Sequence, residues 1–417
     1  MRNPTNSPNC FRRLWLLLLI AWAFVSPLDQ AHADQASGPA LETGFDPSQL
    51  ARIDEEIERA IDERKLPGAV VWLEHKGRSF QKAYGARALQ PRREAMTEDT
   101  IFDAASLTKV LVTAPALLIL HERGKLNIDS PVATVLDEFK DGGKESITFV
   151  QLLTHTSGLN IALRRSPDWG KFGKALESIR TERPRDPPGT RFRYSDINFI
   201  VLGEVVRRVS GTTLDQFANE HIFGPLQMRE TRFVPPSDWI PRIAPTEKSG
   251  EAFLRGQVHD PKALRMGGVA GHAGVFTTAP DLARFARMML NHGELDGTRI
   301  LSAESVRRMT SVQSSPAAQV RRGLGWDIDS EYSRPRGSIF PLGSYGHTGF
   351  TGVSLWIDPF SQTFWILLTN RVHPYGTGDI RSLQRTLGTL AAEAIRDFDF
   401  QHVTGALPPR EAGKSAP

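Results

Sequence analysis

The sequence is almost free of cysteine, since its 417 residues include only Cys10. A disulfide framework needs cysteine pairs, so none can form within this chain. Beyond 12 apolar residues near the N-terminus, which are too few to cross a membrane, no other long apolar run appears. Neither His-Glu-x-x-His nor Gly-x-Ser-x-Gly occurs. The sequence therefore does not support a zinc peptidase of that type or an α/β-hydrolase nucleophile elbow.

An excess of charge of one sign is missing as well. The formal net charge is +4 at pH 7, and no cluster of Lys and Arg with interleaved aromatic residues accompanies it. We therefore expect no nucleic-acid partner. No internal repeat or low-complexity tract is evident either.

The N-terminal segment 1–33 has the pattern of a signal peptide. Arg12 and Arg13 precede 12 apolar residues, Leu14 to Val25, and Ala31-His-Ala33 provides a small-x-small cleavage pattern. Twelve residues are too few to span a bilayer, which takes about 20. An uncleaved anchor is the alternative interpretation.

Cleavage after Ala33 would remove Cys10 and lower the net charge from +4 to +2, because three arginines and one aspartate leave with the segment. We expect an exported protein, in a bacterial periplasm or secreted, with no transmembrane anchor after processing. The sequence leaves the export route open between the general and the twin-arginine pathway.

The most informative stretch runs from Ile101 to Leu120, where a turn of small residues leads into an apolar run that ends near Gly124. A helix that is apolar on all sides is buried, and Ser106 would lie in its first turn. Lys109 follows three residues later, so its amine can reach the Ser106 hydroxyl. Because a helix N-terminus also favours developing negative charge, the pattern indicates an activated serine.

Ser-x-x-Lys is a short pattern, and a second copy begins at Ser79. Residues 69–74, 75–78 and 79–84 have the pattern of a strand, a turn and a second strand. Residues three apart in a strand point to opposite faces, so Ser79 is expected to be structural. The role of Ser106 depends on its structural context, which the other motifs must supply.

A second candidate is Tyr194, which precedes a predicted helix over Ile197 to Val209, closed by Gly211. A tyrosine at such a boundary can project its phenol into a cleft. A lysine ammonium nearby favours the phenolate, which makes Tyr194 a candidate general base for Ser106. The alternative is a tyrosine half-buried for its ring alone.

A third candidate is the segment Gly346 to Phe350, which contains His347, Thr348 and Gly349 at a predicted strand start. Glycines there let a backbone lie close to a substrate. The N–H groups of Phe350 and Ser106 could form an oxyanion hole, while His347 and Thr348 would hold a substrate carboxylate or position a proton. The alternative is an ordinary glycine-containing hairpin.

The two ends of the chain have the same predicted character. Asp46-Pro47 opens a helix with one apolar stripe, and the hairpin 69–84 follows. Near the other end, strands over 352–357 and 363–369 precede a final helix over 379–398. We therefore expect an α/β (α+β) fold, in which an antiparallel sheet flanked by helices is interrupted by an inserted all-helical domain.

The predicted organisation follows from these elements, with the site in the crevice between two domains. A discontinuous α/β sheet domain comprises residues 45–98 and 298–400, and a mainly α-helical domain comprises residues 99–297. Residues 1–33 are the signal peptide, 34–44 a linker and 404–417 a flexible tail.

In chain order, Ser106-x-x-Lys109, Tyr194-Ser-Asp196 and His347-Thr-Gly349 resemble the three motifs of the serine β-lactamase and penicillin-binding protein superfamily. The resemblance covers about residues 45–400 and includes the segments 152–159, 222–226 and 267–274. Tyr-Ser-x is similar to the motif of the branch with class C β-lactamases, D-Ala-D-Ala carboxypeptidases and related esterases.

This resemblance implies a β-lactamase/transpeptidase-like fold and an acyl-enzyme mechanism. Ser106 would attack an amide or ester carbonyl, Tyr194 and Lys109 would share the proton transfers, and water would release the acyl group. No metal or other cofactor is implied. Because coupled groups resist separate assignment, the sequence leaves open which of Tyr194 and Lys109 is the base.

Two residues depart from the family pattern. Asp196 stands where asparagine is usual, so it would pair with Lys109, keep that amine protonated and repel the acylamino carbonyl of a β-lactam. His347 replaces the lysine usual in β-lactamases and would carry a charge that varies near neutrality. Of the other histidines, His155 is expected to cap a helix end, and His272, in a glycine-rich loop, to line the cleft.

The sequence thus predicts an exported serine hydrolase that acts on cell-wall peptides ending in D-Ala. A carboxylesterase or a weak β-lactamase of the same fold is the alternative. A sensor that is acylated but never turns over is the alternative from another class. The expected partner is a small-molecule or peptide substrate, and the oligomeric state stays open.

Overall fold

The computed structural model describes residues 44–162 and 172–410. The predicted signal peptide, nearly all of the linker and the end of the predicted tail lie outside these residues. In chain order the helices are α1 Pro47–Asp62, α2 Ala114–Glu122, α3 Phe149–Leu153, α4 Phe172–Thr181, α5 Asp196–Ser210, α6 Leu214–Ala218, α7 Pro261–Arg265, α8 Ala279–Leu290, α9 Ala303–Thr310 and α10 Arg381–Glu393.

Eight strands form one antiparallel sheet in the order β11-β12-β13-β14-β15-β1-β2-β3. Their bounds are β1 Gly68–His75, β2 Arg78–Ala88, β3 Glu94–Ala95, β11 Arg321–Arg322, β12 Asp327–Asp329, β13 Tyr345–Thr348, β14 Ser354–Asp358 and β15 Thr363–Thr369. Strand β1 pairs with β15 along its length, from Ala69 opposite Thr369 to His75 opposite Thr363. The two ends of the chain therefore build one sheet.

Smaller sheets connect the segments between these strands. One joins β4 Phe102–Asp103, β8 Val275–Thr277 and β5 Arg232–Phe233, and the other two are the pairs β6 Lys248–Ser249 with β7 Ala252–Phe253 and β9 Glu294–Leu295 with β10 Thr298–Arg299. Strand β4 leads directly into the turn that carries Ser106.

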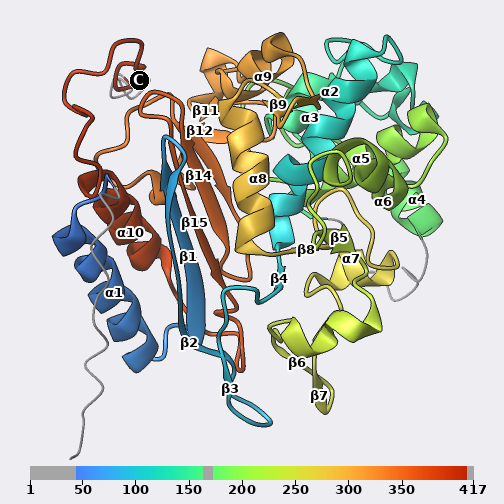
Figure 1. Ribbon diagram of the computed structural model, residues 1–417. Coiled ribbons are helices and arrows are strands. Elements are labelled where there is room, and N and C mark those ends of the chain that lie inside the picture. The colour runs from blue at the N-terminus through green and yellow to red at the C-terminus, as the bar shows by residue number, and fades with distance from the viewer. Residues whose placement is uncertain (1–43, 163–171, 411–417) are drawn as a thin grey trace, which may run out of the picture. The chain divides into compact units, whose positions relative to one another are not determined.

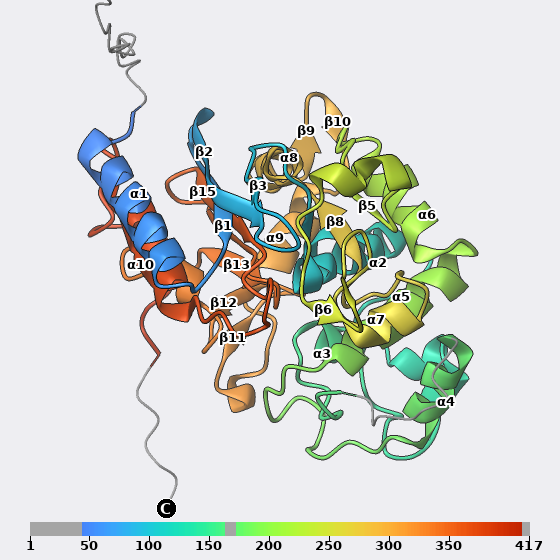
Figure 2. The same ribbon diagram turned by 90° about the horizontal axis from the view of Figure 1, so that it is seen from below.

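Helices cover both faces of the large sheet. Helices α1 and α10 lie side by side on one face, and α8 packs on the other between the sheet and the helical part (Figures 1 and 2). Asp46 caps α1 by accepting a hydrogen bond from Ser48 N at 2.8 Å, and Ile53 and Ile57 are buried against the sheet. The predicted α/β fold is confirmed, whereas the exact domain boundaries stay predictions.

Two other predicted elements have the expected form. The first hairpin turns at Lys76 and Gly77, whose φ values of +49° and +80° suit a tight two-residue hairpin turn. Helix α5 is closed by Gly211 at φ +78°. The final helix is shorter than predicted, because it ends at Glu393 and Ile395 then forms a β-bridge with Phe45.

The predicted apolar helix after Ser106 is present, but its geometry changes along its length. A 3-10 turn over Ala105–Leu107 and a π-helical turn over Lys109–Thr113 precede α2. By length and composition the stretch Ala105–Glu122 could cross a membrane, yet 83% of it is buried in the fold, as a core helix is. Gly124, at φ +65°, follows its end as predicted.

Candidate active site

The side chain of Lys109 is completely buried and lies against the Ser106 hydroxyl. Its Nζ donates three hydrogen bonds, to Ser106 Oγ at 2.9 Å, Asp196 Oδ1 at 3.0 Å and the His272 carbonyl at 3.1 Å. An ammonium has three N–H donors, so every one of them is used. The predicted Lys109–Asp196 pairing is thus confirmed, and the geometry is that of a charged lysine.

The electrostatics of Lys109 agree with this geometry. Burial lowers the pKa of its amine, but Tyr194 and Asp196 together outweigh burial and raise the pKa above its usual value. Burial raises the pKa of the Asp196 carboxyl, because it disfavours the charged form. Lys109 and His272 outweigh this effect and bring the pKa of Asp196 below its usual range. Lys109 is therefore an ammonium and Asp196 a carboxylate near neutral pH.

The turn before Ser106 is held by residues that the sequence analysis did not identify. Ala105 has a φ of +45°, which is uncommon for a residue with a side chain. Asp103 Oδ1 accepts a hydrogen bond from Ala105 N at 2.8 Å, and the Thr351 hydroxyl donates to the Asp103 carbonyl at 2.8 Å. These bonds hold the strained turn and present Ser106 to the cavity.

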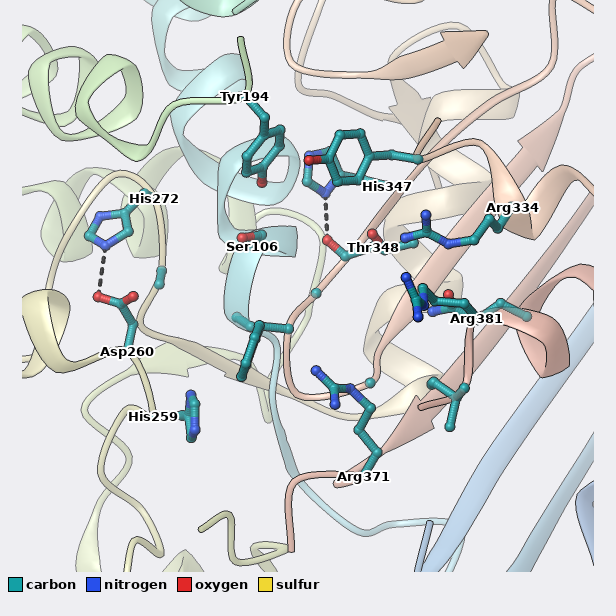
Figure 3. Close-up of a pocket in the computed structure, with 18 of the residues that line it drawn as sticks. Ser106, Tyr194, His259, Asp260, His272, Arg334, His347, Thr348, Arg371 and Arg381 are labelled. Carbon is teal, nitrogen blue, oxygen red and sulfur yellow. Dashed lines mark hydrogen bonds and ion pairs between the residues drawn. The ribbon is translucent and has the colours of Figure 1, made fainter. Parts of the chain in front are cut away.

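The Tyr194 phenol points toward Ser106, and Lys109 Nζ lies 5.1 Å from the centre of the Tyr194 ring (Figure 3). The structure thus brings the three predicted catalytic residues together. They come from the 3-10 turn and π-helical turn before α2 and from the loop before α5. Because its phenol oxygen faces Ser106, Tyr194 is placed to take up the Ser106 proton.

His155 lies behind Tyr194, a position that nothing in the sequence indicates. It follows α3 with a φ of +59°, so the predicted helix-end role is confirmed. Its ring also stacks on the Tyr194 ring, with centroids 4.4 Å apart and planes 29° apart. Its Nδ1 accepts a hydrogen bond from Ser195 N at 3.0 Å. His155 therefore fixes the direction of the phenol.

His347 is neutral in this fold, which contradicts the predicted variable charge. Burial, followed by the charges of Arg322 and Lys109, lowers the pKa of its imidazole well below the usual 6.5. Because Nδ1 lies 2.8 Å from the Thr348 carbonyl, which can only accept, Nδ1 carries the proton. Nε2 is consequently an acceptor, and it is buried without a partner among the described residues.

The His-Thr-Gly segment lies at the end of β13, not at its start as predicted. A Cβ on Gly349 would come within 2.8 Å of the Ala104 carbonyl and 2.5 Å of Val353 Cγ2, so only glycine fits. The close approach places this strand end against the Ser106 turn. Among the hydrogen bonds of the described residues, the N–H groups of Ser106 and Phe350 donate to no protein acceptor, as the predicted oxyanion hole requires.

His272 and Phe350 both line the cavity, as predicted. His272 Nε2 lies 2.9 Å from Asp260 Oδ1, and Phe350 stacks on His259 with ring centroids 5.3 Å apart. Ligand atoms of Asp196, Asp260 and His272 lie within 4.8 Å of one another, so these residues could hold a cation. However, Lys109 already pairs with Asp196, so this cluster is compensated by the protein's own charges.

These residues border one cavity of about 670 Å³. Figure 3 shows His272, Asp260 and His259 on one side of Ser106, and Thr348, Arg334, Arg371 and Arg381 on the other. A serine with a buried lysine, a phenol above it and free N–H groups beside it is the arrangement of a hydrolase that uses an activated serine. Fold and site together define a serine hydrolase of the β-lactamase type.

The comparisons with known proteins agree with this class. The family model described as Beta-lactamase matches residues 53–388, so the chain belongs to the beta-lactamase family. A relative from Escherichia coli (strain K12), named "Putative D-alanyl-D-alanine carboxypeptidase", is 30% identical over 79% of this chain and 84% of its own length.

Two solved structures share the fold at lower identity. A penicillin-binding protein homologue from Caulobacter crescentus is 21% identical, with a TM-score of 0.67, over 84% of this chain and 98% of that one. A family VIII carboxylesterase is also 21% identical, with a TM-score of 0.64, over 84% of this chain and 97% of that one. The fold therefore does not separate peptidase from esterase.

For two buried histidines of the site, His155 and His347, we expect a loss of stability in acid. Burial, followed by nearby cations, lowers the pKa of both His155 and His347 in the folded chain. In the unfolded chain these histidines take up protons near pH 6.5, whereas in the folded chain they stay neutral to lower pH. Their neutral form therefore contributes fully to stability above pH 6.5, and this contribution is lost as the pH falls toward the folded-state pKa values. Between pH 7 and pH 5, we expect the free energy of unfolding to fall by up to about 2 kcal/mol for each histidine.

Urea unfolding at pH 7, 6 and 5 measures this dependence. His155→Asn keeps an acceptor for Ser195 N and tolerates a positive φ, so it should fold and show a flatter pH dependence than the unsubstituted protein. His402→Gln, which changes an exposed histidine, should not flatten it. An unchanged slope in His155→Asn would contradict the assignment.

Proposed function

We propose that this serine hydrolase is an exported carboxypeptidase that removes the C-terminal residue of cell-wall peptides of the D-Ala-D-Ala type. The observation that carries the proposal is the charge of the cavity wall beyond Thr348, where arginines face the space next to Ser106. A peptide substrate has a terminal carboxylate that such a wall attracts. A simple ester has no group that needs it.

The proposed reaction is acyl transfer through Ser106. Ser106 Oγ attacks the penultimate carbonyl while its proton passes to Tyr194, and the N–H groups of Ser106 and Phe350 stabilise the oxyanion. Tyr194 then protonates the leaving amine, and a water molecule releases the acyl group by the same steps. Lys109 stays an ammonium throughout and stabilises the Tyr194 phenolate.

One further observation supports the substrate class, since the name of the Escherichia coli relative refers to this activity. Asp196 places a carboxylate where it would repel the acylamino carbonyl of a β-lactam, which counts against an efficient β-lactamase. Export is proposed from the signal-peptide pattern of residues 1–33. It is tested by determining the N-terminus of protein recovered from the periplasm, where Asp34 is expected.

Three substrates separate the candidate functions. Purified protein is incubated with a D-Ala-D-Ala peptide, penicillin and a short-chain nitrophenyl ester, while products and intact mass are followed. Release of D-Ala together with a slowly cleared penicilloyl adduct supports the carboxypeptidase. Ester turnover alone supports an esterase, fast penicillin turnover a β-lactamase, and a lasting adduct without any turnover a sensor.

Asp196→Asn should increase the rate of acylation by penicillin by about tenfold. The amide can donate to the acylamino carbonyl, whereas the carboxylate of Asp196 repels it. The measurement is the rate at which intact protein gains the penicilloyl mass. Asp196→Ala removes the repulsion without adding a donor, so it should give a smaller gain. A slower rate in Asp196→Asn than in the unsubstituted protein would refute this role of Asp196.

A further inference from the structure

The charged groups of the cavity are paired on one side of Ser106 and incompletely paired on the other. Among the lining residues are four aspartates and four arginines: Asp196, Asp260, Asp327, Asp379, Arg322, Arg334, Arg371 and Arg381. Each aspartate has a cationic or histidine partner, with the pairs Lys109–Asp196, His272–Asp260, Arg322–Asp327 and Arg381–Asp379 at 3.0, 2.9, 3.3 and 2.6 Å. Arg334 and Arg371 are left over.

Arg334 is half-buried beside Tyr332 and has no carboxylate partner among the described residues. One of its guanidinium nitrogens donates to the Glu331 carbonyl at 2.7 Å, and its Nε is buried and has no hydrogen-bond partner in the described part of the chain. The guanidinium lies 5.7 Å from the centre of the Tyr332 ring. Its direction toward the cavity is therefore fixed, while part of its hydrogen-bonding capacity is unused.

Arg371 occupies the same wall in a similar state. It is half-buried, donates to the Gly378 carbonyl, and lies 4.8 Å from the centre of the Phe350 ring, again without a carboxylate partner in the described part of the chain. Burial lowers the pKa of Arg334 and of Arg371, and the positive charge of Arg381 acts in the same direction, whereas Asp327 and Glu331 near Arg334 and Asp379 near Arg371 offset part of this lowering. The free protein thus holds, at one end of its cavity, two guanidinium groups that make no direct ion pair with a carboxylate among the described residues.

This end of the cavity is the side from which the leaving group departs. Tyr194 would protonate that group, and its ring lies 6.1 Å from the ring of His347. Thr348 and the arginines lie beyond His347, on the same side of Ser106 (Figure 3). His347 is neutral and adds no charge there. A leaving D-Ala has one carboxylate, which compensates only one of the two guanidinium groups.

We propose that Arg334 and Arg371 form a subsite for a leaving residue that carries two anionic groups, its α-carboxylate and an acidic side chain. The inference rests on the proposed carboxypeptidase function and specifies its substrate class. A side-chain carboxylate and a side-chain phosphate offer the same chemistry to a guanidinium. The preferred terminal residue is then an acidic amino acid or a phosphorylated one, with D-Ala accepted more weakly, and the D-Ala before it supplies the acyl group.

Binding to Ser106→Ala tests the subsite without requiring turnover. Calorimetry compares N-acetyl-D-alanyl-D-glutamate with its D-glutamine counterpart, which has the same shape but one charge fewer. We expect the D-glutamate peptide to bind at least about tenfold more tightly. Equal affinities, or no binding of either peptide, would overturn the proposal.

Substitution of the two arginines tests whether they cause the preference for the D-glutamate peptide. Arg334→Met with Arg371→Met should bring the affinity ratio close to one, whereas lysines at both positions should restore part of it. Arg385→Met removes an exposed charge on α10 outside the cavity and should leave the ratio unchanged. A preference for D-glutamate that survives the double methionine variant in folded protein would place the subsite elsewhere and refute the assignment.

Two further experiments identify the preferred anion and separate failure of the subsite from failure of the proposed function. O-phospho-D-serine and D-serine as the terminal residue distinguish a phosphate from a carboxylate, since the larger affinity ratio identifies the preferred anion. Hydrolysis by the unsubstituted protein is measured with the same peptides and with D-alanyl-D-alanine. If D-alanyl-D-alanine is hydrolysed and peptides that end in an acidic residue are not preferred, the proposed subsite is wrong while the proposed function stands. Absence of all peptide hydrolysis overturns the proposed function, and the binding ratio still decides the subsite.

Discussion

Ser106→Ala is expected to lower kcat/KM for a nitrophenyl ester by about 10⁴-fold or more. The methyl group cannot form the acyl bond, and what remains is the contribution of substrate binding and of the oxyanion donors. The measurement is steady-state hydrolysis by freshly folded protein, with thermal unfolding recorded in parallel. Because Ser106 lies at the cavity surface and only its Oγ is removed, we expect little change in the unfolding temperature.

The chain supplies its own matched control. Ser79 begins the other Ser-x-x-Lys copy, on β2, where Ser79 is exposed and Lys82 pairs with Asp54 at 2.7 Å. Ser79→Ala should therefore leave kcat/KM unchanged. If Ser106→Ala kept activity within tenfold of the unsubstituted protein, or if Ser79→Ala lost it, the nucleophile would have to be assigned again.

Lys109→Met should lower kcat/KM by about 10³-fold, the second largest effect. It removes the ammonium that donates to Ser106 Oγ at 2.9 Å and lies 5.1 Å from the centre of the Tyr194 ring, beside the proposed path of the proton. It also leaves Asp196 without its buried partner, so we expect a loss of stability of about 2 kcal/mol. Rates and urea unfolding are measured on the same preparations.

A double variant separates the catalytic effect from the structural one. Lys109→Met with Asp196→Asn removes both charges, so stability should largely return while the rate stays low. Lys82→Met, at the half-exposed lysine of the other copy, should change the rate little. Recovery of the rate together with stability would show that Lys109 acts only by holding the fold.

Features that depend on local sequence could be predicted. The spacing of Ser106 and Lys109, the cap at Asp46 and the glycine stop at Gly211 follow from residues close together in the chain, and the structure has each of them. The three catalytic candidates were found because each motif has its own local pattern, although only the fold brings them to one cavity.

Features that depend on distant contacts could not be predicted. His155 precedes the residue it stacks on by 39 positions, and nothing in Thr154-His-Thr marks it as a support for Tyr194. The neutrality of His347 comes from burial, which a motif does not report. Arg334 begins a 3-10 turn and Arg371 lies in the turn after β15, and their shared lack of a carboxylate partner among the described residues is visible only once the neighbours are placed.

The position of the His-Thr-Gly segment shows the same limit. Glycines on both sides of a polar pair predicted a close backbone approach, and Gly349 does lie against the Ser106 turn. The sequence placed this segment at a strand start because the strand was expected after it. In the structure β13 precedes Gly349, and the chain then turns back into β14.

The central claim is that the Ser106 hydroxyl, activated beside Lys109, becomes acylated during turnover. Rapid acid quenching of nitrophenyl ester hydrolysis, followed by trypsin digestion and mass spectrometry, tests it directly, because Ser106 lies in the peptide 94–109 and Ser79 in the peptide 79–82. We predict that the acyl mass appears on Ser106 and is absent from Ser106→Ala. An acyl group on any other residue of an active preparation, with Ser106 unmodified, would contradict the account.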